Sequence, residues 1–429
     1  MRINVKMKKQ LILLAFTLLA SWAFCQETAQ TRKITIDDAV VLAADNNVNL
    51  NREKIKLDTL KKRNTYSWNS VSPSASLSAN LNKPLEQDTY NYSISGSISV
   101  SLTPSLYTAI KTAKINYENG VSSYEDTVRT VELNVRKLFY NLIYTKESIE
   151  VKKRNMETAQ KRYQNNKDRY NRGQLSELDL LQSQYSYESM LPDIESAQIA
   201  YDSSLASFKQ TLGIPQNEQI QLVGALEDAI PPESFSVDMA IEDIPAIKNL
   251  KAKIELQKTQ LLATRFSAWG PTLTASYSYG KSGMKGMDEL QTTGNAISLG
   301  VRIPLDGYLP WSNGTLSIDS QKATLADLEL QLENEKTTAS LTIQNSLKNI
   351  MQKQGQIEML ERNVEIAQKA YDMTLIAYNH GSKDLMSLQN SADSLKAAQL
   401  NQQTQIYSLI CAVLELENTL GVPFGTLGE

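Results

Sequence analysis

The sequence predicts a mainly α-helical chain that carries four β-strands and is built from two similar halves. Three observations predict this fold class: a duplicated set of motifs, two very long segments that lack helix-breaking residues, and four segments of alternating polar and apolar residues. The motifs recur at one spacing, because Gly381 follows Gly173 by 208 residues and "TLGVP" (419–423) follows "TLGIP" (211–215) by the same number. We therefore expect both halves to share one plan.

Each half is predicted to contain a helix, a β-hairpin, a very long helix, a glycine turn and a returning helix. The first repeat is placed at 26–230 and the second at 231–429. In the first repeat, the strands are expected at about 73–102, the long helix at about 105–170 and the return helix at about 176–212. In the second, the corresponding elements are expected at about 271–303, 313–379 and 384–420.

The first 25 residues have the layout of a cleavable secretory signal peptide. Four basic residues precede the apolar run Leu11 to Ala20, and Ala23 and Cys25 stand just before the expected cleavage point. Residues 1–25 are therefore left out of the fold. A membrane anchor is disfavoured because the run is about half of the ~20 residues needed to span a bilayer. Lipid attachment to Cys25 is an alternative, although Phe24 stands where a lipoprotein signal has a small residue.

Composition argues against nucleic acid as a partner and against enzymatic chemistry. Removal of the four basic residues of the signal would take the formal charge from −3 to −7, which disfavours binding to phosphates. His380 is the only histidine, and Cys411 is the only cysteine after Cys25. These two residues cannot build a His/Cys metal cluster, and no glycine loop for phosphate binding occurs. We predict no catalytic residue, no metal and no cofactor.

The two breaker-free segments carry strict seven-residue ladders of apolar and tyrosine residues. From about 105 to 170, a continuous helix at 1.5 Å per residue would be on the order of 100 Å long. A sustained seven-residue repeat keeps one seam on a helix that supercoils around its neighbours. The sequence thus predicts a rod of antiparallel helices. The ladders are Val121, Val128, Val135, Leu142, Ile149, Met156, Tyr163 and Tyr170, and Ile343, Ile350, Ile357, Val364, Tyr371 and Tyr378.

The strands alternate so regularly that they predict one apolar face and one wet face. In "NYSISGSISVSL" (91–102), serines alternate with apolar residues or glycine. Strands of this length match tilted membrane-spanning β-strands, whose apolar face meets lipid. Trp68, Trp269 and Trp311 flank the strands, as expected for an aromatic girdle. One chain supplies only four strands, so a closed barrel requires several copies, and three copies would give twelve strands.

The chain resembles the TolC-type outer-membrane efflux and secretion channels over nearly its whole mature length. The resemblance runs from "ITIDDAVVLAADNNVNL" (34–50), which looks like the opening helix of that family, through the strands that begin at Pro73 and Pro271. It continues through both glycine turns to the "LGIP" and "LGVP" endings. It implies a homotrimer with a twelve-stranded transmembrane β-barrel in the outer membrane of a Gram-negative bacterium and an α-helical coiled-coil tunnel in the periplasm.

The resemblance also implies a function and partners. Such a channel is the passive exit duct of a tripartite efflux or type I secretion system, and outer-membrane lipid surrounds its barrel. Its periplasmic tip meets an adaptor (membrane fusion) protein and an inner-membrane transporter of the RND or ABC type. The residues that match the family's tip are Tyr170, Asn171, Arg172, Gly173, Leu175, Asn379, His380 and Gly381. Arg172 and His380 depart from the apolar residue usual before each glycine.

A pore constriction is implied by the same resemblance. Asp179 matches an aspartate that links neighbouring inner helices in the closed state, and Tyr378 and Lys383 match its aromatic and basic partners. We hypothesise that Asp179 bonds to Lys383 or Tyr378; the alternative is that Asp179 is a solvated turn residue. The resemblance also places Ser387 and Asn390 at the positions of an aspartate double ring in the family, so no carboxylate ring is expected from the second half.

A rival interpretation is a periplasmic coiled-coil adaptor or scaffold that forms no channel. It accounts for the seven-residue ladders and for the export signal. It does not account for two equal halves, or for strands that lie between helices and have tryptophans at one end. Membrane fractionation separates the two interpretations, since only a channel remains in the outer membrane.

Overall fold

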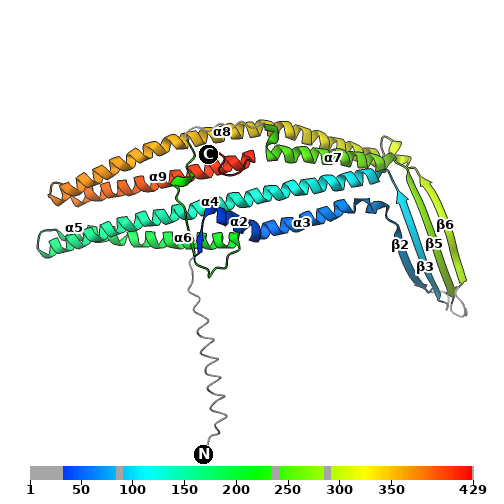
Figure 1. The fold of residues 1–429 in the computed structure, drawn as a ribbon, viewed down its shortest axis with the longest axis horizontal. Helices are drawn as coiled ribbons and strands as arrows, with labels where there is room; N and C mark the ends of the chain where they lie inside the picture. Colours follow the sequence, from blue (N-terminus) through cyan, green and yellow to red (C-terminus); the bar gives the residue numbers. More distant parts are fainter. Residues whose placement is uncertain (1–31, 84–89, 233–240, 285–290, 428–429) are drawn as a thin grey trace, which may run out of the picture.

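The structure, a computed structural model, describes residues 32–83, 90–232, 241–284 and 291–427. The expected signal peptide and Cys25 lie outside these residues. The helices form a long rod, and a four-stranded sheet extends from one end of it (Figure 1). The first half contains β1 (Arg32–Ile34), α2 (Ile36–Asn46), α3 (Val48–Thr65), η1 (Ser67–Val71), β2 (Ser74–Asn82), β3 (Asn91–Leu102), α4 (Ser105–Asn171), α5 (Glu177–Glu188), α6 (Met190–Leu212), β4 (Ile220–Leu222) and η2 (Glu227–Ala229). The second half contains η3 (Ile241–Asp243), α7 (Pro245–Trp269), β5 (Thr272–Met284), β6 (Gln291–Arg302), η4 (Asp306–Tyr308), α8 (Asn313–Asn379) and α9 (Leu385–Leu420).

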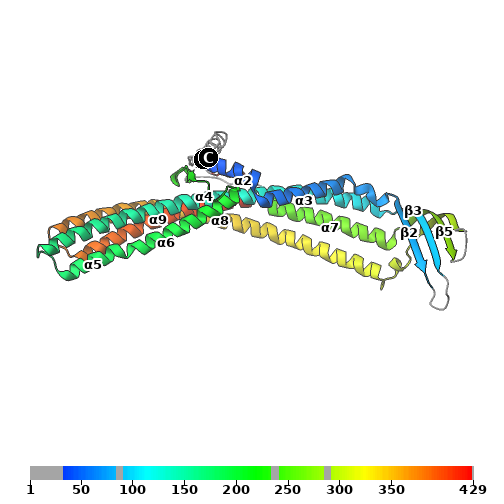
Figure 2. The same cartoon turned by 90° about the horizontal axis from the view of Figure 1, so that it is seen from below.

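The two long helices set the length of the rod. Helices α4 and α8 each contain 67 residues, so each is about 100 Å long. Helices α5 and α6 return along α4, and α9 returns along α8, while α3 and α7 pack beside the halves of the long helices nearer the sheet (Figure 2). The predicted fold class, mainly helical with a duplicated plan, is confirmed. Among the described residues, no helix combines the length and the apolar character that crossing a membrane requires.

The largest hydrophobic core lies in the middle of the rod, where helices from both halves meet. The ladder residues Val135, Leu142 and Ile350 are fully buried there. Phe139 of α4 packs against Phe208 of α6, with ring centroids 6.3 Å apart. These contacts join segments that are far apart in sequence, so the core in the middle of the rod holds the two halves together.

Glu417 of α9 is fully buried beside this core and holds the C-terminal segment in place. Its Oε1 accepts hydrogen bonds from the backbone N–H groups of Gly425, at 2.9 Å, and Leu427, at 3.0 Å. Burial raises the pKa of Glu417, and the two N–H donors and Arg136 act in the opposite direction. The Glu417 side chain therefore holds the segment that contains Gly425 and Leu427 against α9, and its removal from water has a free-energy cost.

Two of the expected helices are interrupted in the structure. The opening segment begins as strand β1, which pairs in parallel with β4, and a break at Asn47 separates α2 from α3 because the Asn47 side chain caps α3. The return helix expected at about 176–212 is divided into α5 and α6 at Ser189. Pro192 lacks an N–H group and cannot donate to the carbonyl of Glu188, which accounts for the second break.

Candidate functional site: a two-faced sheet and a helical tip

The serines of the sheet form one continuous polar face. The strand order is β2-β3-β5-β6, and neighbouring strands are antiparallel. Three serine pairs face each other across β2 and β3, with hydroxyl oxygens 2.7, 2.8 and 2.7 Å apart. The face continues into β5, because Ser97 lies opposite Ser278 and Ser99 opposite Ser276. These hydroxyl pairs leave lone pairs and donors for water on one side of the sheet.

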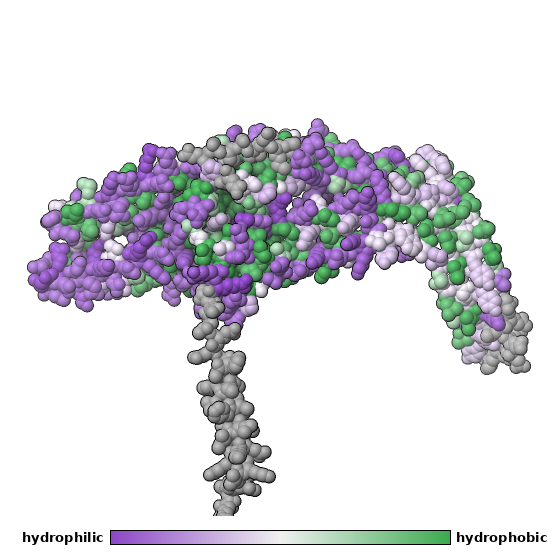
Figure 3. Space-filling view, in the orientation of Figure 1, coloured by the Kyte–Doolittle hydropathy of each residue, from purple (hydrophilic) through white to green (hydrophobic). Residues whose placement is uncertain are grey.

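The opposite face of the sheet is apolar and exposed. Ile98 lies opposite Ala75 and Tyr277, and Tyr277 lies opposite Ile297. Leu77, Ile297 and Leu299 are 80%, 79% and 82% exposed, and hydrophobic side chains gather over the strands in Figure 3. Keeping such a surface in water costs roughly 25 cal/mol for each Å². An apolar patch that extends over four strands indicates a non-aqueous neighbour.

Aromatic side chains mark the junction between the sheet and the rod. Trp68 belongs to η1, Trp269 ends α7, and Trp311 precedes α8; they are 54%, 39% and 76% exposed. The indole Nε1 of Trp269 donates a hydrogen bond of 2.8 Å to the carbonyl of Gly307 and its ring stacks on Tyr308. Rings with an apolar body and a polar edge suit a membrane–water boundary.

The far end of the rod is formed by two turns of the same geometry. After α4, Gly173 has φ +69°, its N–H donates to the carbonyl of Tyr170 and the next N–H donates to Arg169, at 2.8 Å each. After α8, Gly381 has φ +75° and makes the same pair of bonds one repeat later. Each turn is a Schellman motif, in which glycine supplies the left-handed conformation. Both glycines have open space around them, so backbone conformation is what requires glycine.

The residues that follow these turns cap the return helices. The two halves use a serine and an aspartate in opposite order for this purpose. In the first half, Ser176 caps α5, and its hydroxyl donates a 2.7 Å hydrogen bond to Oδ2 of Asp179. In the second half, Asp384 occupies the equivalent capping position and accepts a hydrogen bond from the backbone of Ser387 at 2.9 Å. The hydrogen bonds from Ser387 hold the pKa of Asp384 below its usual value. Both sides of the tip thus obtain a cap from a serine–aspartate pair.

Tyr378 connects the two hairpins at the tip. Its ring is buried with Leu385 and Leu388, and its hydroxyl donates a hydrogen bond of 2.9 Å to Oδ1 of the buried Asn166 on α4. The guanidinium of Arg169 lies 5.8 Å from the centre of the ring. Neither Asn166 nor Arg169 was singled out from the sequence, because no local pattern distinguishes them from other polar residues of α4.

The other residues expected at the tip surround these turns. Tyr170 is 38% exposed, and Leu175 is half-buried. The surface at this end of the rod is mainly hydrophilic (Figure 3). The remaining residues expected at the tip are exposed: Asn171, Arg172, Gly173, Asn379, His380 and Gly381.

The residues expected at the constriction do not all meet within one chain. Asp179 bonds to Ser176, and Tyr378 bonds to Asn166. Among the described residues, neither Tyr378 nor Lys383 forms a hydrogen bond or ion pair with Asp179. Lys383 and Asn390 are exposed, and Ser387 is half-buried. A bond between Asp179 and Lys383 therefore stays a prediction for neighbouring chains.

Comparison with known proteins agrees with this architecture. The sequence profile of the family described as outer membrane efflux protein matches residues 46–214 and 237–422. A curated relative, nodulation protein T of Rhizobium leguminosarum bv. trifolii, is 23% identical over 323 residues. The match covers 72% of this chain and 64% of that protein, so this chain aligns with less than two thirds of the relative's length.

Solved structures share the fold over most of both chains. The CmeC outer membrane channel of Campylobacter jejuni has a TM-score of 0.73 and 18% identity, covering 90% of this chain and 85% of that chain. The open state of the MtrE outer membrane channel of Neisseria gonorrhoeae has a TM-score of 0.71 and 16% identity, with 90% and 89% covered. The profile match includes both halves and both glycine turns. The chain therefore belongs to the outer membrane efflux protein family.

Proposed function

We propose that this chain is one subunit of a passive exit duct in the outer membrane. The observation that carries the proposal is the two-faced sheet at the end of a rod about 100 Å long. Three copies would bring twelve strands together, with the apolar faces in lipid and the serine faces around water. The helical rods would then form a tunnel that extends through the periplasm, and the role is transport, with no chemical conversion.

Family membership places the chain in the outer membrane, and we propose that its helical tip meets the other components of a tripartite system. The tip presents two exposed turns with the same backbone geometry. Such a repeated surface suits a periplasmic adaptor protein, which would connect the duct to an inner-membrane transporter of the RND or ABC type. In this arrangement the transporter selects the substrate, and the duct conducts what it receives.

The decisive experiment is to determine the size and shape of the protein after extraction in detergent. Light scattering is expected to give three copies per particle, and negative-stain images are expected to show a rod about 100 Å long attached to a detergent-bound barrel. Membrane fractionation of the same cells should recover the protein with the outer membrane. A water-soluble monomer or dimer would overturn the proposal.

A further inference from the structure

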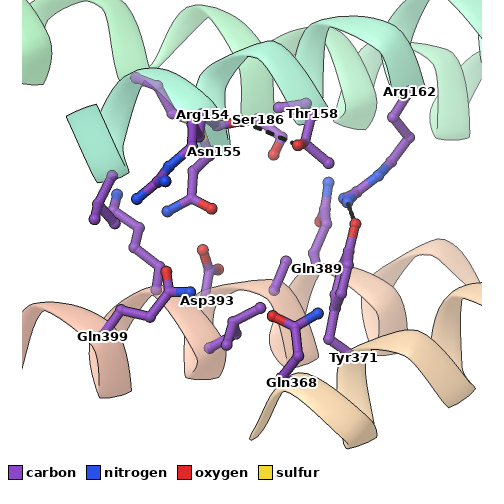
Figure 4. Close-up of a pocket in the computed structure, with 16 residues that line it drawn as sticks. Arg154, Asn155, Thr158, Arg162, Ser186, Gln368, Tyr371, Gln389, Asp393 and Gln399 are labelled. Carbon is purple, nitrogen blue, oxygen red and sulfur yellow. Dashed lines mark hydrogen bonds between the residues drawn. The ribbon is translucent and has the colours of Figure 1, made fainter. Parts of the chain in front are cut away.

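A polar cavity, open to solvent, lies between the hairpin of α4 with α5 and α6 and the hairpin of α8 with α9. Its volume is about 360 Å³. Figure 4 shows side chains from both hairpins pointing into it, including Arg154 and Asn155 from α4 and Asp393 from α9. The volume is within the range of small-molecule sites, roughly 300–1,000 Å³.

The charged groups of this cavity are predominantly cationic. Arg154, Arg162 and Lys396 line it together with a single carboxylate, Asp393. Among the described residues, none of these four groups belongs to an ion pair within 4.0 Å. Arg154 and Asp393 are exposed, and Arg162 and Lys396 are half-buried, so solvent screens these charges only in part. The cavity therefore carries an excess of positive charge that nothing in the described chain neutralises.

The equivalent helix of the second half shows that this arrangement is not a general consequence of the fold. Arg362 is the counterpart of Arg154 one repeat later, and it forms an ion pair with Glu358 one turn before it on α8. Glu150 occupies the position of Glu358 in the first half. Arg154 forms no ion pair with Glu150 in the described chain, and its side chain turns toward the cavity instead (Figure 4).

Hydrogen-bond donors in the cavity wall also lack acceptors. The side-chain Nδ2 of Asn155 is buried and has no hydrogen-bond partner in the described chain. Within the part of the chain that the structure describes, the Arg162 guanidinium forms one side-chain hydrogen bond, a long one of 3.4 Å to the hydroxyl of Tyr371. A buried donor without an acceptor is unfavourable. Water can accept such bonds, but it does not offset the positive charge.

We propose that this cavity binds a phosphate-type oxyanion. An oxyanion supplies the negative charge and several acceptor oxygens for Arg154, Arg162 and Asn155. The single carboxylate, Asp393, points into the same space (Figure 4), and it would repel an anion that has no proton. Hydrogen phosphate carries a hydroxyl that donates to Asp393, whereas sulfate at neutral pH does not. The site should therefore prefer phosphate to sulfate.

This proposal is independent of the duct function, because binding is measured on the extracted protein without any flux. Isothermal titration calorimetry of the full chain in detergent, at constant ionic strength, should show saturable binding of inorganic phosphate and weaker binding of sulfate. Titration with glycerol 3-phosphate shows whether the site takes free phosphate or an esterified phosphate group. Absence of saturable phosphate binding would overturn the proposal.

Three variants distinguish loss of the binding site from loss of folding, because one of them is expected to increase an affinity. Arg162→Gln should weaken phosphate binding about tenfold, since it removes a charge-assisted hydrogen bond. Asp393→Asn should tighten sulfate binding and abolish the preference for phosphate. Lys153→Gln, an exposed residue of α4 that does not line the cavity, should leave both affinities unchanged. Equal effects of Arg162→Gln and Lys153→Gln, or an unchanged preference in Asp393→Asn, would refute the site.

Discussion

At the scale of single residues, Tyr378 and its counterpart Tyr170 have different environments although the repeat places them at equivalent positions. Tyr378 is buried and bonded to Asn166, while Tyr170 is 38% exposed. Equivalent sequence positions therefore contribute differently to stability, because the tertiary contacts of the two hairpins differ.

Replacing Tyr378 by phenylalanine tests the contribution of its hydroxyl. Tyr378→Phe leaves Oδ1 of Asn166 buried without a donor, and Nδ2 of the same side chain already lacks an acceptor. We expect a local loss of about 1–3 kcal/mol, measured as faster amide hydrogen exchange at the tip. Tyr170→Phe is the matched control and should change exchange little. Similar rates in the two variants would contradict the assigned role.

Glu417 should make stability depend on pH. Because its pKa is raised in the folded protein, its contribution favours the folded state below the ordinary pKa of glutamate and is lost as pH rises through the raised value. The thermal unfolding midpoint of Glu417→Gln should therefore depend less steeply on pH across this window than that of the wild type. Glu415→Gln, which changes an exposed carboxylate two residues away, should keep the wild-type profile; a matching flattening there would refute the assignment to Glu417.

At the scale of elements, the helix ends and the sheet faces follow from local rules. The turns at the tip require a positive φ, whereas Gly355 lies in the interior of α8 with open space around it. A methyl group added at either position meets no neighbour, so the backbone alone decides the effect.

Two glycine-to-alanine replacements should therefore change stability in opposite directions. Gly381→Ala is expected to destabilise the tip by about 1–2 kcal/mol, because alanine disfavours the left-handed region. Gly355→Ala is expected to stabilise α8 by up to about 1 kcal/mol, because alanine favours a helix interior. Unfolding midpoints of the two variants provide the comparison, and a shift of the same sign in both would show that the turn does not need glycine.

The two faces of strand β6 provide a test of which side meets lipid. Ile297→Lys puts a charge on the apolar face and should cost about 2–4 kcal/mol if the position lies near the bilayer midplane. Ser298→Lys puts the same charge on the serine face, where water should tolerate it. The amount of assembled protein in outer-membrane fractions should fall for the first variant only. A larger loss for Ser298→Lys would reverse the assignment of the faces.

At the scale of the whole molecule, the proposed constriction depends on contacts between copies of the chain. Tyr378 already bonds to Asn166 within the chain, so the exposed Lys383 is the better partner for Asp179. A lysine makes a single point-charge contact, and an exposed pair contributes only ~0–1 kcal/mol. A threefold assembly would repeat it three times.

Single-channel recordings in planar bilayers test this constriction. Asp179→Ala and Lys383→Ala should each raise conductance, and the double variant should add little to either single change, as expected for two partners of one contact. Asp193→Ala, on the neighbouring helix α6, serves as the control for an acidic residue outside the contact. Unchanged conductance in Asp179→Ala would show that its role is confined to capping α5 with Ser176.

The repeat, the long helices and the two faces of the sheet can all be predicted from the amino-acid sequence alone. These features depend on residue periodicity and on the absence of breakers, which are local properties of the chain. The glycine turns at 173 and 381 were predictable for the same reason, since a Schellman motif involves only neighbouring residues. The break at Ser189, where one continuous helix was predicted, also has a local cause, because Pro192 cannot donate a hydrogen bond to the carbonyl of Glu188.

Contacts between side chains that are distant in sequence depend on how the helices pack. Strand β1 pairs with β4, about 190 residues away, Tyr378 bonds to Asn166 across 212 residues, and the cavity collects charges from helices of both halves. No sequence pattern encodes such pairs, because each side chain gains its partner only when the hairpins pack. The difference between predictable and unpredictable features has a physical cause. Hydrophobic periodicity and turn formation depend on residues that are close in sequence. Charge balance and hydrogen-bond satisfaction within the rod depend on every helix that packs around a given side chain.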